Sequence, residues 1–185
     1  MRKVKRSDVV DFQTYNDGRE EYRRRILEEK AKRRIHVGGH LTFLFESTDT
    51  MLYQVQEMMR LEQIAREKDI VHEIDTYNQL LGDSGELGCT LLIEIDDQAV
   101  RTQKLQAWLG LTEHVYVRLA DGRLVRAVWD PMQVGDTRLS SVQYLKFPVG
   151  SGEPVAIGVD HRELREETVL TPEQRQTLLA DARDE

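Results

Sequence analysis

The stretch that decides the fold is residues 34–78, RIHVGGHLTFLFESTDTMLYQVQEMMRLEQIAREKDIVHEIDTYN. It contains three of the five histidines of the chain and most of its regularly spaced apolar residues. Its first part, Arg34–Glu46, has Gly38-Gly39 between two extended runs, and a glycine pair of this kind is typical of a tight hairpin turn. A two-residue turn predicts that Val37 and His40 pair across it.

The remainder of the stretch predicts a helix and then a strand. Ser47 and the polar residues after it can cap a helix N-terminus, and apolar residues recur at helical spacing until about Lys68. Residues Asp69–Tyr77 then alternate apolar and polar side chains, with Ile70 and Ile74 on one face, as in a half-buried strand.

Helices and strands are also predicted on both sides of this stretch. Before it, a thin apolar stripe indicates a helix that Asp17-Gly18 divides in two. The first segment is short, and the longer N-terminal helix starts at about Arg19. After it, residues 90–147 predict the order β-α-β-β-β. The fold class is therefore α+β, with a mostly antiparallel sheet, flanking helices and a long N-terminal helix.

Domain organisation follows from a linker at Pro148–Pro154 (PVGSGEP). We predict a single α+β domain at residues 1–148 and a C-terminal extension at 149–185. The extension has one strand at Val155–Val159 and a short helix, which a capping box at Thr171–Gln174 opens.

Composition restricts the class of protein. The 185 residues are 39% hydrophobic and 32% charged, with a net charge of −7. An acidic chain of this kind argues against general binding to nucleic acid or anionic membranes. It has no apolar run of about 18 residues that could span a bilayer and no secretory signal, and its single cysteine, Cys89, excludes an internal disulfide. We expect a cytoplasmic protein.

Familiar catalytic motifs are absent from the sequence. There is no G-x-G-x-x-G after a strand, no G-x-x-x-x-G-K-[ST] and no G-x-S-x-G. His72-Glu73 does not begin H-E-x-x-H, because position 76 is threonine. Arg60 follows Glu57 where a di-iron helical bundle would have histidine. The catalytic residues are therefore unknown, and whether the protein is an enzyme is left open.

Histidine and carboxylate side chains within the stretch suit iron, zinc or manganese if the hairpin, helix and strand pack together. The candidate metal ligands are His40, Glu57, His72 and Glu73. Glu57 is the most informative, because a buried carboxylate needs a cation or several hydrogen-bond donors. In the alternative interpretation, His40 lies at an exposed turn, His72 packs on the sheet, and Glu57 pairs with Arg60 or with an arginine of the first helix.

The N-terminal helix is rich in charge. Residues 19–34 contain eight basic residues and four glutamates. This composition is explained by a solvent-exposed helix face on which opposite charges form ion pairs one turn apart. Contact of this helix with a partner or with nucleic acid is the alternative.

Three blocks of sequence resemble a bacterial family of domains of unknown function, DUF3501. They are RRIHVGGHLTFLFE, YQVQEMMRLEQI and HEIDTYNQLL, and the likeness continues through TLLIEI, LGL and SSVQYLKF to cover about residues 8–147. Gly39 stands where the family pattern has proline. The positions matching the most recognisable blocks include our candidate ligand-binding residues, Glu57, Arg60, Glu62, Tyr77 and Asn78.

The resemblance implies a setting and supplies no catalytic residue. Genes of the family tend to neighbour those for a rubrerythrin-like protein and for an iron–sulfur oxidoreductase similar to heterodisulfide reductase subunits. We therefore expect an accessory protein of an iron-dependent redox or peroxide-metabolism system, which binds a partner protein and a metal. Two alternatives stay open. One is a small-molecule enzyme with an acid–base pocket of Glu57, Arg60 and Tyr77; the other is a pure protein-interaction module whose basic helix docks on an acidic partner.

Overall fold

The computed structural model describes residues 1–133, 135 and 137–184. The helices are α1 (Phe12–Arg33), α2 (Thr48–Leu61), α3 (Glu67–Asn78), α4 (Gln98–Ala107) and α5 (Pro172–Arg183), with short 3-10 turns at Arg6–Asp8, Leu111–His114 and Pro131–Gln133. The strands are β1 (Arg34–Val37), β2 (Leu41–Phe45), β3 (Leu87–Ile93), β4 (Val115–Leu119), β5 (Leu124–Arg126), β6 (Val142–Phe147), β7 (Pro154–His161) and β8 (Leu164–Val169). The α+β class and the long N-terminal helix are confirmed.

The described strands form two four-stranded antiparallel sheets, in the orders β1-β2-β3-β6 and β5-β4-β7-β8. The sheets meet at both edges. Val128, just after β5, exchanges backbone hydrogen bonds of 2.7 and 2.8 Å with Lys146 of β6. At the other edge, the Thr168 hydroxyl of β8 donates to the carbonyl of His36 in β1 at 2.7 Å. The two sheets therefore surround one core.

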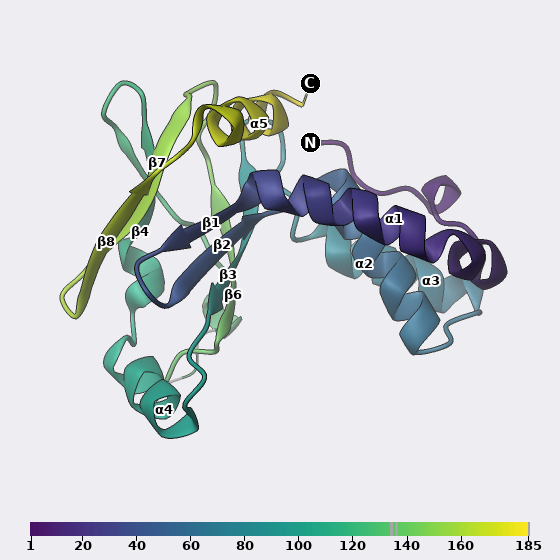
Figure 1. Ribbon diagram of the computed structural model, residues 1–185, viewed down its shortest axis with the longest axis horizontal. Coiled ribbons are helices and arrows are strands. Elements are labelled where there is room, and N and C mark those ends of the chain that lie inside the picture. Colours follow the sequence, from purple (N-terminus) through teal and green to yellow (C-terminus); the bar gives the residue numbers. More distant parts are fainter. Residues whose placement is uncertain (134, 136, 185) are drawn as a thin grey trace.

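That core combines the inward side chains of both sheets with residues from two helices. Phe43 and Phe147 are fully buried in the first sheet. Leu105 of α4 and Leu178 of α5 belong to the same cluster, and Figure 1 shows α4 and α5 at opposite ends of the sheets. Burial of each such side chain stabilises the fold by roughly 1.5–3 kcal/mol.

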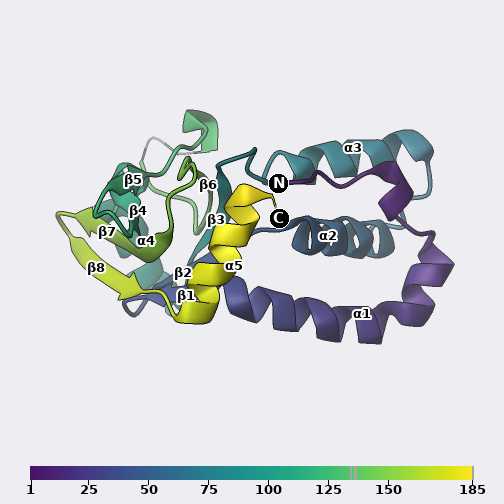
Figure 2. The same cartoon turned by 90° about the horizontal axis from the view of Figure 1, so that it is seen from above.

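Helices α1, α2 and α3, with the segment that precedes them, project from the sheets as a helical arm, which comprises residues 1–33 and 48–78 (Figure 1). Figure 2 shows the N-terminal segment, residues 1–11, running beside α3 to the far end of the arm, where α1 begins and returns to the sheets. A second apolar cluster holds the arm together, and its members are Val4, Val9, Met51, Val55, Met59, Ile70, Ile74 and Leu81.

The predicted hairpin is present with a loop one residue longer than expected. Val37 pairs with Leu41 rather than with His40, and Gly38 takes a φ of 61°, which glycine adopts without strain. The cap predicted at Ser47 is also present, because its side chain accepts from the backbone N–H of Thr50.

The predicted strand at Asp69–Tyr77 is wrong: these residues belong to helix α3. Its two buried residues, Ile70 and Ile74, are four apart, a spacing that fits both a strand face and one turn of a helix. The preceding helix α2 ends at Leu61 rather than near Lys68.

Helix α1 passes through Asp17-Gly18 without the predicted interruption. It begins after Asp11, whose side chain caps it by accepting from the N–H of Thr14 at 3.0 Å. No helix in the described ranges combines the length and the apolar character that crossing a membrane requires.

The C-terminal part contributes two strands, where the sequence indicated one. β7 lies between β4 and β8 in the second sheet, so it is a central strand. Helix α5 begins with the predicted capping box, in which the Thr171 side chain accepts from the N–H of Gln174 at 3.2 Å.

Candidate functional site in the helical arm

Glu57 of α2 directs its carboxylate toward α1 and is only 9% exposed. Arg19 donates to both carboxylate oxygens, from Nε at 2.7 Å and from Nη2 at 2.9 Å. The Tyr15 hydroxyl donates at 2.6 Å and Arg60 Nη2 at 3.3 Å. Charged donors of this kind offset the cost of burying a carboxylate. We call these residues, Tyr15, Arg19, Glu57 and Arg60, the Glu57 network.

The network fixes the protonation state of its members. The hydrogen bonds from Arg19 lower the pKa of Glu57 from 4.5 to about 2, with smaller contributions from Tyr15 and Arg60, while burial opposes the shift. Burial and the hydrogen bond to Glu57 raise the pKa of Tyr15. At neutral pH Glu57 is therefore ionised and Tyr15 keeps its proton, as in a structural ion pair rather than an exchanging acid–base pair.

Helical spacing brings these residues together. Tyr15 and Arg19 are one turn apart on α1, and Glu57 and Arg60 are one turn apart on α2. Both pairings that the sequence offered for Glu57, with Arg60 and with an arginine of the first helix, are present. The Tyr15 contact could not be predicted from the sequence, because this tyrosine was interpreted only as part of an apolar stripe.

The other candidate metal ligands lie elsewhere. His40, in the loop between β1 and β2, lies beside Trp108, which directly follows α4, with 5.9 Å between ring centroids. His72 is exposed on α3 and Glu73 is half-buried there. In the part of the chain that the structure describes, no three His, Cys, Asp or Glu side chains are grouped so that they could hold a metal ion.

The reason for this separation is the change from strand to helix. The prediction placed residues 69–77 in the sheet beside the hairpin, whereas α3 carries His72 and Glu73 into the arm. Strand β2 runs from the loop of His40, beside α4, to the base of the arm. His40 and Glu57 therefore lie beyond opposite ends of β2.

Two side-chain amides hold the N-terminal segment. Asn78 accepts from the N–H of Val4 at 2.8 Å and donates to its carbonyl at 3.0 Å. Gln56 makes the same pair of bonds to Val10, at 2.7 and 3.3 Å. Each amide thus satisfies both backbone groups of one valine. Asn78, a candidate ligand-binding residue, is occupied by the chain's own N-terminal segment.

The remaining candidates are dispersed along the arm. Tyr77 is half-buried and packs against the arm's apolar cluster, and Glu62 is exposed at the C-terminal cap of α2. Among the five candidate ligand-binding residues, Glu57 and Arg60 form an ion pair with each other. A role for these five in binding a ligand stays a prediction.

The fold and the arm define the class: an α+β protein whose two sheets surround one core and carry a three-helix arm. The chain belongs to the family described as "Protein of unknown function (DUF3501)", which matches residues 3–182. The family resemblance is thereby confirmed, and the match includes β7, β8 and most of α5.

A solved structure has the same architecture. It is a novel protein of unknown function from Burkholderia pseudomallei K96243, with 28% sequence identity and a TM-score of 0.89. The similarity covers 97% of this chain and 99% of that one. No curated protein matches this chain.

Proposed function

We propose that this protein is a cytoplasmic accessory protein that docks on an acidic surface of a partner protein through one flank of α1. Its setting is the iron-dependent redox or peroxide metabolism that the family resemblance implies. The observation that supports docking is a basic stripe with an exposed leucine at its centre. We call this stripe, Arg23, Leu27 and Arg34, the docking flank.

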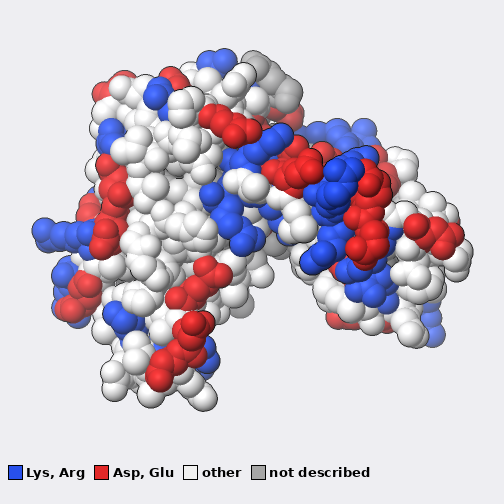
Figure 3. Space-filling model, viewed as in Figure 1, with Lys and Arg blue, Asp and Glu red and all other residues white. Residues whose placement is uncertain are grey.

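Arg23 and Leu27 share one side of α1, because they are four residues, about one turn, apart. Arg34 stands at the C-terminal end of the same helix, where β1 begins. Leu27 is 51% exposed. Arg23 and Arg34 are exposed and make no ion pair with any described residue, whereas Arg24 pairs with both Glu21 and Glu28. Figure 3 shows Lys and Arg side chains gathered along α1, with Asp and Glu side chains between them.

These features suit an interface with an acidic partner. Arginine binds carboxylates through two parallel hydrogen bonds and is common at interface hot spots. Burying the exposed half of Leu27 on docking would contribute about 1 kcal/mol. Because the chain as a whole carries a net charge of −7, an unpaired basic flank also orients it toward an acidic surface. The rubrerythrin-like protein and the iron–sulfur oxidoreductase are the proposed partners.

Charge reversal tests the proposal. The double variant Arg23→Glu/Arg34→Glu should weaken binding to the purified partner at least about tenfold, since two attractive contacts become repulsive. Arg162→Glu/Arg165→Glu, in the turn between β7 and β8 and at the start of β8, makes the same charge change far from α1 and should bind as the unmodified protein does. Titration calorimetry gives both affinities.

Ionic strength provides a second measurement. Affinity that depends on the docking flank should fall as salt rises from about 0.05 M to about 0.5 M, because screening weakens exposed charges. An affinity that changes neither with salt nor on charge reversal would exclude the docking flank as the binding surface.

Metal binding by His40, Glu57, His72 and Glu73 is a separate hypothesis, because the arrangement of these side chains does not support it. Elemental analysis of protein purified without chelators tests it. If a metal is retained, the double variant Glu57→Ala/His72→Ala should lose it. An unchanged metal content in the folded variant would assign the metal to other residues.

A further inference from the structure

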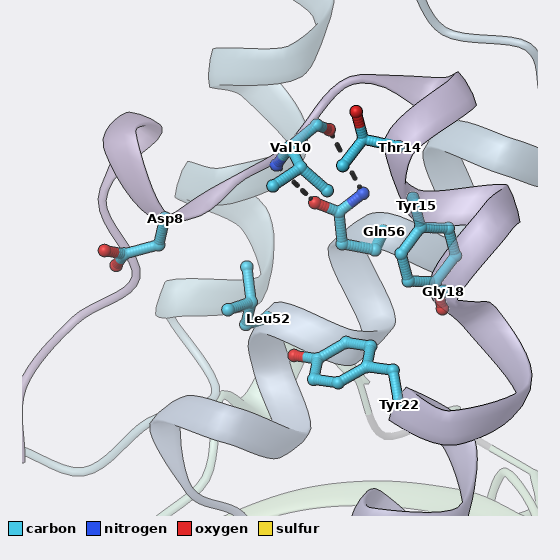
Figure 4. Close-up of a pocket in the computed structure, with 8 residues that line it drawn as sticks. All are labelled: Asp8, Val10, Thr14, Tyr15, Gly18, Tyr22, Leu52 and Gln56. Carbon is cyan, nitrogen blue, oxygen red and sulfur yellow. Dashed lines mark hydrogen bonds between the residues drawn. The ribbon is translucent and has the colours of Figure 1, made fainter.

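A pocket of about 240 Å³ opens between α1, α2 and the N-terminal segment (Figure 4). Because residues three or four apart share a helix face, Gly18 and Tyr22 lie on a different side of α1 from Arg23 and Leu27. Val10 and Leu52 provide aliphatic walls. Tyr15 and Tyr22 provide aromatic ones, and their rings meet edge to face, with centroids 5.9 Å apart and an interplanar angle of 88°. The pocket is therefore mostly apolar, as small-molecule sites usually are.

Gly18 forms part of the wall. It lies between Tyr15 and Tyr22 on the same stripe of α1, so this position faces α2. Glycine inside a helix is destabilising relative to alanine. Here it is not required by the backbone, because its φ is not positive, nor by crowding, because a Cβ would meet no atom within 4 Å. Its effect is to leave the pocket open.

Tyr22 brings an unpaired hydroxyl to the lining of this pocket. Its hydroxyl is buried and has no hydrogen-bond partner among the described residues, and in Figure 4 it lies in the pocket beside Leu52. Burial raises the pKa of Tyr22 to about 12, so the hydroxyl keeps its proton as a donor. An unpaired buried hydroxyl is costly unless something accepts from it.

We infer that the pocket binds a small, uncharged aromatic molecule whose carbonyl oxygen accepts a hydrogen bond from Tyr22. The tyrosine rings favour an aromatic occupant. An ionised ligand is disfavoured because it would lose its hydration without a free countercharge. The carboxylate of Asp8, at the rim, is already paired with Arg2 at 2.6 Å. Such an occupant would touch both helices and the N-terminal segment at once.

The experiment compares two probes of the same shape on the full chain. 2-Acetylnaphthalene has the carbonyl acceptor and 2-ethylnaphthalene lacks it, and ligand-observed NMR titration gives both affinities. Replacement Gly18→Leu, which places a side chain in the pocket, should weaken both probes at least about tenfold. Tyr22→Phe should weaken the ketone about fivefold to tenfold and leave 2-ethylnaphthalene unchanged.

Gly18→Ala is the control for folding. Its methyl group is too small to fill the pocket, so it should raise the thermal midpoint and keep ketone binding. Arg23→Glu, on the docking flank, should also keep it, which separates this site from partner docking. The inference is overturned if the ketone fails to bind up to its solubility limit, or if it binds Gly18→Leu as tightly as the unmodified chain. Either result would make the pocket a solvent-filled gap.

Discussion

At the scale of single residues, Glu57 shows why removing a buried and paired charge destabilises the folded state. Its carboxylate receives hydrogen bonds from two guanidinium groups and a phenol. Replacing it with a neutral group would leave Arg19 partly buried without its main partner. Deleting one member of a buried ion pair costs more than the pair itself contributes, because an uncompensated charge stays behind.

The first prediction concerns the size of that cost. Glu57→Gln should lower the free energy of unfolding by about 2–4 kcal/mol, because the amide keeps the shape but neither the charge nor two acceptor oxygens. Urea denaturation measures the difference. Glu62→Gln, an exposed position at the end of the same helix, should change it little, and equal effects at the two positions would contradict the role of the Glu57 network.

The second prediction concerns pH. The pKa of Glu57 is lowered from 4.5 to about 2 by its hydrogen bonds with Arg19, so the folded state prefers the ionised form. Its contribution is complete above the unfolded pKa and is lost as the pH falls through the folded one. The stability difference between the unmodified protein and Glu57→Gln should therefore be constant above about pH 5.5 and shrink steadily toward about pH 2.

Denaturation series at several pH values measure that difference. A difference that stays constant across the acid range would mean that Glu57 titrates at its ordinary pKa. A difference that grows on acidification would reverse the sign of the linkage.

At the scale of elements, the sequence predicted structure best where a local signal exists. The glycine pair predicted the hairpin, and the helix caps predicted at Ser47 and Thr171 are both made by the side chains of these residues. Helix α3 lacked such a signal, since Arg66 makes no side-chain cap. Only packing of Ile70 and Ile74 on α2 distinguishes a helix from a strand there, and that contact is not local.

The candidate site shows the same division. Because the sequence neighbours of Glu57 are apolar, the sequence predicts that its carboxylate needs hydrogen-bond donors. One of these donors, the Tyr15 hydroxyl, is 42 residues away in the chain. The amides of Asn78 and Gln56 bind a segment that is 74 and 46 residues distant. Partners at such separations depend on the path of the chain, which residue spacing alone does not give.

The third prediction concerns the N-terminal segment. Asn78→Ala should leave both backbone groups of Val4 without their partner and thereby loosen residues 3–10. The free energy required to open this segment locally should fall by about 1–3 kcal/mol. Hydrogen–deuterium exchange should accelerate in that segment while the sheets keep their protection. Gln103→Ala, an exposed amide on α4, is the control. Unchanged exchange in Asn78→Ala would show that burial of Val4 and Val9 and the Gln56 amide hold the segment without Asn78.

At the scale of the whole molecule, closure of the sheets and attachment of the arm are both long-range features. β7 enters between β4 and β8, and β8 reaches β1 from the other end of the chain. Alternation along a strand predicts which face is buried but not which strand lies beside it. The arm is attached at its base by a buried ion pair, in which Arg33 of α1 binds both carboxylate oxygens of Asp181 in α5, at 2.8 and 3.0 Å.

The last prediction concerns this ion pair. Arg33 is 8% exposed, and Asp181→Ala would leave it with Glu29 as its remaining charged partner. The free energy of unfolding should fall by about 2–4 kcal/mol, and exchange should increase at the C-terminal end of α1 and in α5. Glu21→Ala removes an exposed ion pair with Arg24 on the same helix, made at 2.6 Å, and should change stability little because solvent screens that pair. If the two variants behave alike in urea denaturation and in exchange, apolar contacts alone hold the arm to the sheets.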